Sequence, residues 1–516
     1  MSRLENTSKN FVYSIAGTIL TSLLGFITRY VFVKRIGIEY VGANGLFTNV
    51  LSMLSLTELG LGSAIAFSLY KPLAENDTET IKSLMLFYKK AYRIIAIAIF
   101  SLGLCLIPFL KYIIKNPGKI EHVTWIYLIF LYNTSISYVF SYKTTLLNAD
   151  QKTYLMTGFN MKIGVCTALI QLIVMVIFEN YYIYLLSAAV INTCQWFFIN
   201  RFIYKRYPYL QEIKVSPLSP SILKTIVTNV KAMVFHKVGE LCINQTDNII
   251  ISAFISIGAV GLYDNYYTII GIISRLANAL FNAATASLGN LIATEGNEKR
   301  YSVFKAYNFL GFWVYSWTGI CLFVLLTPFV ELWLGKEYII DGLTITLVMV
   351  NYYLVGMRTT VGNIKMAAGL YSQDQWVPIA QAIINLAVSI LAVRKMGLAG
   401  VFLGTVVSSI SIPCWYRPIV VYKYAFDKPV KEYFRSYVLY ALITGANYFL
   451  VYIINSLLIE TKISNVFGVF FLKMICCAII PNATIVLLFR KTDEFQYIIG
   501  IIRTFWGKTR WGLRHS

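Results

Sequence analysis

A stripe of polar and ionisable side chains runs along one apolar segment of the chain. The segment 226–254 carries His236, Glu240, Asn244 and Asp247 at steps of three or four residues, and Lys237 lies beside the first of them. Residues at this spacing share one face of a helix. Ionisable groups inside a membrane are costly and usually face a partner or a water-filled cavity. We therefore expect this face to line a functional cavity.

Four carboxylates within apolar segments are candidates for binding a proton or a cation. They are Glu58, Glu240, Asp247 and Asp264. Because a low-dielectric site favours the neutral form of a carboxyl group, one of them could take up a proton or pair with Na+, and so bias the side on which the cavity opens. His236 could share that proton with Glu240, although a histidine that only packs and hydrogen-bonds is the commoner case.

Three arginines within apolar segments predict a different chemistry. A guanidinium group presents a planar set of donors to the oxygens of an anion, so Arg29, Arg275 and Arg358 are candidate ligands for an anionic group in the cavity. Asn49 adds a neutral polar group to the same expected cavity. Arg29 and Arg275 are the first choices, because they lie farthest from a position at which the side chain could reach water.

A structural role is the competing interpretation of these charges. Glu240 could pair with Lys237, and Asp264 could pair with Arg275, in which case the pairs would only hold helices together. This explains a single residue better than it explains a whole stripe. Lys365 lies near an expected helix end, where a lysine ordinarily extends its ammonium group to the water.

The composition requires that these residues be positioned by membrane-spanning helices. Of 516 residues, 57% are apolar and 13% are charged, whereas a soluble domain has about 25% charged residues. Apolar runs long enough to span a bilayer predict an all-α polytopic membrane protein with about fourteen transmembrane helices. The expected spans are 11–33, 41–70, 91–114, 123–142, 155–178, 181–203, 226–254, 258–290, 303–334, 338–364, 375–393, 397–422, 434–458 and 464–489.

An internal repeat groups these spans into two lobes. Ile38-Glu39-Tyr40-Val41-Gly42 matches Ile257-Gly258-Ala259-Val260-Gly261 at an offset of 219 residues. Six spans lie between equivalent points, so the repeats would be parallel, and spans 1, 2, 7 and 8 would line one central cavity. We expect an N-terminal six-helix lobe over 1–210, a C-terminal six-helix lobe over 220–425, two extra helices over 430–490 and a basic cytoplasmic tail over 491–516. The tail is predicted to be either an interfacial helix or disordered.

The distribution of basic residues sets the orientation. The formal net charge is +21, and the basic residues lie between apolar segments. If the N-terminus is cytoplasmic, 29 of the 45 Lys and Arg fall in inward segments and nine in outward ones. This bias predicts that both termini are cytoplasmic, in the cell membrane, and it makes nucleic acid an unsuitable partner.

The sequence lacks the catalytic motifs of several enzyme classes. The only Gly-Lys-Thr, at Gly507, has Ile502 where a P-loop needs glycine, and the three histidines form no metal-binding motif. We therefore expect no cofactor and no metal, and no enzymatic activity. The outward loops are also short for a membrane glycan polymerase or ligase.

The chain also resembles a known family. The stretches Val41-Gly42-Ala43-Asn44-Gly45-Leu46-Phe47-Thr48-Asn49, Glu58-Leu59-Gly60-Leu61-Gly62, Leu69-Tyr70-Lys71-Pro72-Leu73-Ala74-Glu75, Asp247-Asn248-Ile249-Ile250-Ile251-Ser252 and Val260-Gly261-Leu262-Tyr263-Asp264-Asn265-Tyr266 resemble the bacterial polysaccharide transporter family. These proteins are flippases of lipid-linked oligosaccharide repeat units, in the multidrug/oligosaccharidyl-lipid/polysaccharide exporter superfamily. The similarity extends over nearly the whole chain.

The resemblance implies a substrate and partners. The substrate would be an undecaprenyl-diphosphate-linked oligosaccharide, and a polysaccharide polymerase and glycosyltransferases would be candidate partners. The lipid II flippase branch tends to carry several arginines in helix 1, whereas this chain has only Arg29. A cation-coupled multidrug antiporter is the main alternative, although that branch usually has twelve helices; a membrane glycan polymerase or ligase is the other.

Overall fold

The computed structural model describes residues 3–58, 60–114, 120–150, 152–212, 217–370, 372–459 and 465–512. In these ranges the secondary structure is helical, with no strand. The chain packs as two compact units, Met1–Asp264 and Asn265–Ser516. Helices satisfy their own backbone hydrogen bonds, as a chain in lipid must. The predicted all-α architecture is therefore confirmed.

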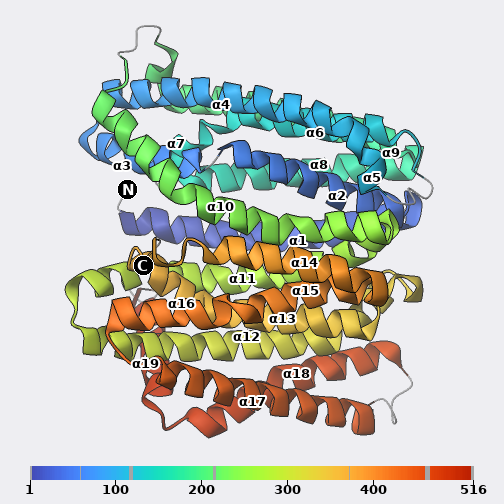
Figure 1. Cartoon of the computed structure of the whole chain (residues 1–516), viewed down its shortest axis with the longest axis vertical. Helices are drawn as coiled ribbons and strands as arrows, with labels where there is room; N and C mark the ends of the chain where they lie inside the picture. The colour runs from blue at the N-terminus through green and yellow to red at the C-terminus, as the bar shows by residue number, and fades with distance from the viewer. Residues whose placement is uncertain are drawn as a thin grey trace. The chain divides into compact units, whose positions relative to one another are not determined.

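The first unit consists of long helices packed side by side. It contains α1 (Arg3–Arg35), α2 (Ile38–Leu54), α3 (Leu61–Glu75), α4 (Thr78–Leu106), α5 (Leu110–Ile113), α6 (Val123–Ser141), α7 (Thr144–Ala149), α8 (Thr153–Phe178), α9 (Tyr181–Arg206), α10 (Pro220–Phe254) and the first turns of α11 (Ile257–Thr294). Within this unit α1 packs on α8 and α4 packs on α6 (Figure 1). Helix α10 packs on α2 and α3.

The expected span 41–70 is broken into two helices. A 3-10 turn over Ser55–Glu58 follows α2, and α3 begins after Gly60, whose φ is +77°. This left-handed conformation carries no steric penalty in glycine. The break displaces the helix axis at the position of Glu58. The expected span 397–422 is likewise divided, into α15 (Leu398–Ser411) and α16 (Pro413–Val421), because Pro413 has no backbone N–H with which to continue the helix.

The second unit contains the remainder of α11 and eight further helices among the residues described. They are α12 (Asn297–Trp333), α13 (Gly342–Ala367), α14 (Val377–Met396), α15, α16, α17 (Lys431–Ile454), α18 (Val466–Phe489) and α19 (Asp493–Gly512). Helices α17, α18 and α19 all pack against α12 (Figure 1). The described part of the predicted tail is therefore a helix.

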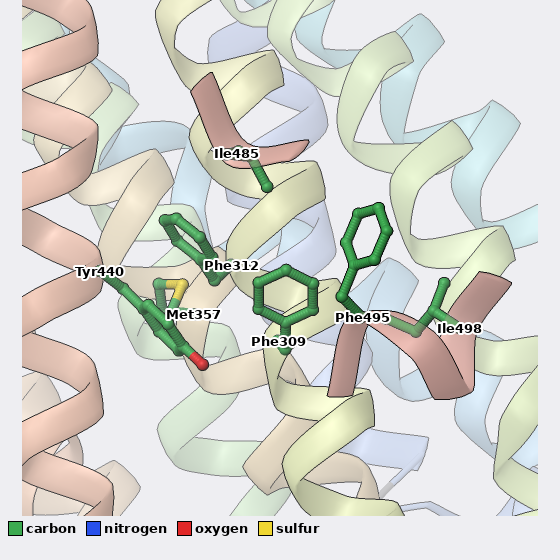
Figure 2. Close-up of a cluster of buried hydrophobic side chains, with 7 residues drawn as sticks. All are labelled: Phe309, Phe312, Met357, Tyr440, Ile485, Phe495 and Ile498. Carbon is green, nitrogen blue, oxygen red and sulfur yellow. The ribbon is translucent and has the colours of Figure 1, made fainter. Parts of the chain in front are cut away.

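An aromatic cluster holds α19 in the second unit. Phe309 and Phe312 of α12 lie between Tyr440 of α17 and Phe495 of α19 (Figure 2). The rings of Phe312 and Tyr440 are stacked with centroids 4.2 Å apart. Phe495 is 7% exposed. Burial of a large aromatic side chain stabilises a structure by roughly 1.5–3 kcal/mol, so the start of α19 is anchored to the helical core.

Helix starts recur at the offset that the sequence repeat predicts. Helices α2 and α11 begin at Ile38 and Ile257, and α4 and α12 begin at Thr78 and Asn297. Helices α6 and α13 begin at Val123 and Gly342. Each pair is separated by 219 residues. The periodicity of the helices therefore matches the periodicity of the motifs.

Ten helices of the described part are long and apolar enough to span a membrane. Four of them are α4, α6, α8 and α9. The other six are α11, α12, α14, the pair α15 and α16, α17 and α18. Helices α2, α10 and α13 are not among them, and α2 has only 17 residues. The chain is a multi-pass membrane protein, while the count of fourteen spans and the central cavity stay predictions.

Candidate functional site

Arg29 and Asp264 form an ion pair in the first unit. The Nη2 atom of Arg29, near the end of α1, contacts Oδ2 of Asp264, in the second turn of α11. The two side chains are 18% and 19% exposed. Neither side chain is therefore fully buried. Asp264 thus pairs with an arginine from a distant helix rather than with Arg275.

Two further helices border this ion pair. A Cβ atom built on Gly45 of α2 would lie 3.5 Å from Oδ1 of Asp264 and 3.5 Å from Nδ2 of Asn248, on α10. Asn248 is 7% exposed, and its Oδ1 accepts no hydrogen bond from the residues that the structure describes. An unsatisfied buried amide oxygen costs free energy and so marks a place for a donor. The structure therefore brings together residues from α1, α2, α10 and α11.

Most of the predicted stripe on α10 cannot be assigned contacts. The side chains of His236, Lys237, Glu240 and Asn244 lie outside the described part of the structure. Asp247 is half-buried on the same helix, directly before Asn248. The chemistry proposed for the stripe therefore stays a prediction.

Glu58 ends a chain of hydroxyl groups. The Tyr92 hydroxyl donates to Oε1 of Glu58, and the Tyr88 hydroxyl donates to that of Tyr92 over 3.0 Å. The hydroxyl of Thr145, on α7, lies 3.1 Å from that of Tyr88. Both tyrosines are buried on α4. The break after α2 therefore directs Glu58 at a buried polar chain that could hold or relay a proton. Asn49 is half-buried on α2.

Two predicted arginines belong to the second unit and differ in exposure. Arg275 has an exposed side chain on α11. Arg358 is 7% exposed, and its guanidinium donates to Ser409 O over 3.2 Å and to Ser409 Oγ over 3.4 Å. The Ser409 hydroxyl in turn donates to Asn351 over 3.0 Å. Arg358 thus joins α13 to α15, whereas Arg275 can be reached by a ligand.

A buried charge cluster in the second unit escaped the sequence interpretation. Lys365 is 7% exposed, and its Nζ contacts both carboxylate oxygens of Asp374 at 2.7 Å. Asp374 is fully buried, and Nε of Arg417 lies 3.6 Å from its Oδ2. The prediction that Lys365 extends to the water is wrong, because its ammonium group pairs with the buried carboxylate of Asp374. The acidic residue nine positions later was the available signal.

Comparison with known proteins agrees with this architecture. Residues 7–286, more than half of the chain, match a protein family described as "Polysaccharide biosynthesis protein". No match to a curated protein sequence was found. The fold is similar to a structure of the lipid II flippase MurJ in an inward closed conformation, with 14% identity, a TM-score of 0.66, and coverage of 93% of this chain and 99% of that one.

Two further transporters have the same fold. A structure of the Vibrio cholerae MATE transporter VcmN has 14% identity and a TM-score of 0.59, and covers 83% of this chain and 99% of that one. A Pyrococcus furiosus transporter of the MOP superfamily has 13% identity and a TM-score of 0.53, covering 82% and 97%. These likenesses establish the fold, and the match over 7–286 establishes the family: the chain belongs to the polysaccharide biosynthesis protein family, with a polytopic membrane fold like that of MurJ and the MATE transporters.

Proposed function

We propose that this protein is a flippase that moves an undecaprenyl-diphosphate-linked oligosaccharide repeat unit from the inner to the outer leaflet of the bacterial cell membrane. The observation that carries the proposal is that a member of a polysaccharide biosynthesis family has a transporter fold. Sugar hydroxyls and a diphosphate lose their water in hydrocarbon without replacement. Such a substrate therefore needs a polar route, which alternating access would supply.

The Arg29–Asp264 pair supports a mechanism for binding the substrate. The diphosphate would displace Asp264 as the partner of Arg29, because a guanidinium binds phosphate oxygens in the same planar geometry as carboxylate oxygens. Both side chains are partly exposed, so the exchange needs no unfolding of a buried pair. The released carboxylate of Asp264 would then take up a proton or Na+. Substrate binding and cation binding would thereby be coupled at one position.

The other candidate residues are assigned supporting roles. Arg275, whose side chain is exposed, is a further candidate ligand for phosphate. Arg358 is bonded to Ser409, and we assign it to positioning α13. Asn49 and Asn244 would bind sugar hydroxyls. Glu58, Glu240 and Asp247 would serve the coupling cation, and His236 and Lys237 would line the cavity.

The proposed topology fits the route of the substrate. Both termini lie in the cytoplasm, where glycosyltransferases would complete the repeat unit, and a polysaccharide polymerase would receive it on the outer face. The 1–210 and 220–425 lobes would rock about the bound substrate, while 430–490 would accompany its lipid tail and 491–516 would lie at the cytoplasmic surface. The sequence repeat at an offset of 219 residues supports this two-lobed movement.

A deletion strain tests the function directly. Loss of the gene should trap lipid-linked repeat units on the inner leaflet and abolish the surface polymer, while drug sensitivity stays unchanged. If the polymer persists and only drug tolerance falls, the protein is an antiporter. If repeat units reach the outer leaflet but stay unpolymerised, it is a polymerase or ligase.

Complementation of that strain tests the site. Arg29→Ala should fail to restore the polymer. The matched control is Arg35→Ala, on the same helix, whose ion pair with Glu179 is half exposed (52% and 50%). If Arg29→Ala and Arg275→Ala both restore transport at native expression, the cationic mechanism is wrong.

A further inference from the structure

A basic pocket lies at one end of the first unit, apart from the Arg29–Asp264 pair. Its volume is about 460 Å³, and it opens between the start of α4, the end of α6, the end of α9 and the turn that follows α9. The lining residues are Lys82, Met85, Leu86, Lys89, Tyr142, Lys143, Tyr204, Leu210, Gln211 and Glu212. Three lysines and one glutamate line this pocket, so it carries a positive charge.

Lys143 is the buried cation of this pocket. It is 4% exposed, and its Nζ donates to Oδ1 of Asn200 and lies 3.7 Å from the ring centroid of Tyr204. Among the residues that the structure describes, no carboxylate pairs with Lys143 or with Lys89. A buried ammonium group is normally paired with an anion. The pocket therefore contains a positive charge that the protein itself leaves uncompensated.

The one carboxylate in the lining is already engaged. Glu212 accepts from Lys82 over 2.6 Å, and Lys82 also pairs with Glu79. The charge of Lys82 is thus neutralised by these two carboxylates. The Lys82–Glu212 ion pair also holds the turn after α9 against α4. Burial, followed by the charges of Lys89 and Arg93, lowers the pKa of Lys143 to about 8. An anion bound here would relieve that repulsion.

The position of the pocket suggests the source of the anion. Lys82 and Lys89 lie in the N-terminal half of α4, and Lys143 follows the end of α6, in segments that the charge distribution predicts to be cytoplasmic. In that orientation the pocket would lie at the depth of lipid headgroups, and basic pockets at the cytoplasmic ends of membrane helices are suited to anionic headgroups. Met85 and Leu86 add an apolar side to the lining, which suits the glycerol and upper acyl chain of a lipid.

We propose that this pocket binds the phosphate of a lipid headgroup through Lys143 and Lys89. Two sources share this chemistry. One is the phosphodiester of an anionic phospholipid of the bilayer, and the other is the diphosphate of a polyprenyl-linked glycan waiting to be transported. The proposal does not depend on the proposed function, because a phospholipid site would be present whatever the protein transports.

Binding to the purified full-length protein tests the proposal. The probes are dioctanoyl phosphatidylglycerol, dioctanoyl phosphatidylcholine as the net-neutral control, and inorganic diphosphate. Phosphatidylglycerol should bind saturably, and Lys143→Gln should weaken its binding about tenfold, the scale of one lost charge-assisted bond. Lys89→Gln is a second variant, at a half-buried position, in case Lys143→Gln does not fold. Lys90→Gln, at the exposed neighbouring lysine, is the matched control and should leave binding unchanged.

The outcomes separate the sources and the alternatives. Binding of phosphatidylglycerol that is sensitive to Lys143 and Lys89 identifies a bilayer lipid. Binding of diphosphate alone with the same sensitivity identifies the phosphate of the substrate. If neither anion binds, if phosphatidylcholine binds equally well, or if Lys90→Gln has the same effect as the other two variants, the proposal is overturned.

Discussion

Gly42 and Gly261 lie in reciprocal contact at the starts of α2 and α11. A Cβ atom on Gly42 would lie 1.9 Å from the carbonyl oxygen of Ile257, and one on Gly261 would lie 2.3 Å from that of Ile38. The two glycines and the two isoleucines are each 219 positions apart. Reciprocal contacts of this kind are produced by a local two-fold axis. Equivalent positions of the two sequence repeats are thus in contact with each other here.

This close contact predicts that adding a methyl group to either glycine destabilises the protein. Gly42→Ala and Gly261→Ala should each lower the free energy of unfolding by about 1–3 kcal/mol, the usual cost of overpacking, and by similar amounts. Thermal denaturation of the purified protein would measure the loss. Gly258→Ala is the control, because its nearest neighbour would be 3.8 Å away. Equal stability of all three variants would contradict the close approach.

The Arg29–Asp264 pair predicts different effects on stability and on transport. Exchanging the charges, with Arg29→Asp and Asp264→Arg together, should keep the melting temperature near that of the natural protein. Transport should nevertheless fall about tenfold or more, because the guanidinium then extends from α11 and no longer from α1, and the phosphate loses at that position a charge-assisted bond worth about 1.5–3 kcal/mol. Flipping assays in vesicles would measure it. Normal transport by the exchanged protein would show that the pair is only structural.

The conservative change at the same position gives a second measurement. Arg29→Lys should restore transport only in part, because lysine provides a point charge without the planar fork. Rates should therefore rank natural protein, Arg29→Lys and Arg29→Ala. Full activity of Arg29→Lys would mean that charge alone is required there.

The Lys365–Asp374 cluster predicts a large loss of stability. Asp374→Asn leaves Lys365 and Arg417 beside each other without the carboxylate that lies between them. Breaking a buried ion pair costs about 3–5 kcal/mol, and denaturation of the variant would reveal it. Replacing both members, as Lys365→Met with Asp374→Leu, should recover part of the loss. If Asp374→Asn is as stable as the natural protein, the cluster is not a stabilising contact.

The pKa of Lys143 predicts that anion binding weakens in alkali. Its folded-state pKa is lowered to about 8 from the ordinary 10.5, so the ammonium form is present at pH 7 and falls to about a tenth at pH 9. A phosphodiester keeps its charge over this range. Affinity for phosphatidylglycerol should therefore fall by up to about tenfold between pH 7 and pH 9. Calorimetric titration at several pH values would measure it.

The variant Lys143→Arg should keep its charge and so remove that pH dependence. The other charged or titratable groups around Lys143 are Lys82, Lys89 and Arg93 of α4, Tyr142 after α6, Tyr204 of α9 and Glu212. An unchanged pH profile in Lys143→Arg would assign the titration to one of these groups instead.

Reporter fusions test the orientation that the basic residues predict. Fusions after Ser216 and after Leu513 should both report the cytoplasm, and a fusion after Lys336 should report the outside. A periplasmic signal at either of the first two positions would overturn the assignment of spans.

The extent and order of the helices could be predicted because they depend on local sequence. Each expected span coincides with a helix or with a pair of broken helices, since an apolar run in lipid has no other way to satisfy its backbone. The breaks were missed at Gly60 and at Pro413. Each break is caused by the backbone preference of one residue. A hydropathy average over a long window does not detect such a preference.

The partners of the charged residues depend on contacts between distant segments. Sequence interpretation offered Arg275 as a possible partner of Asp264, as the competing structural role, whereas the partner in the structure is Arg29, 235 residues away. It assigned Lys365 to the water because the turn into α14, which encloses Asp374, is invisible in a hydropathy pattern. The buried Lys143 was counted only as a marker of orientation. The sequence by itself determined the helices, the family resemblance and the repeat, because these are recorded in local composition and order; the tertiary structure alone decided which charges meet, because that depends on how helices pack across hundreds of residues.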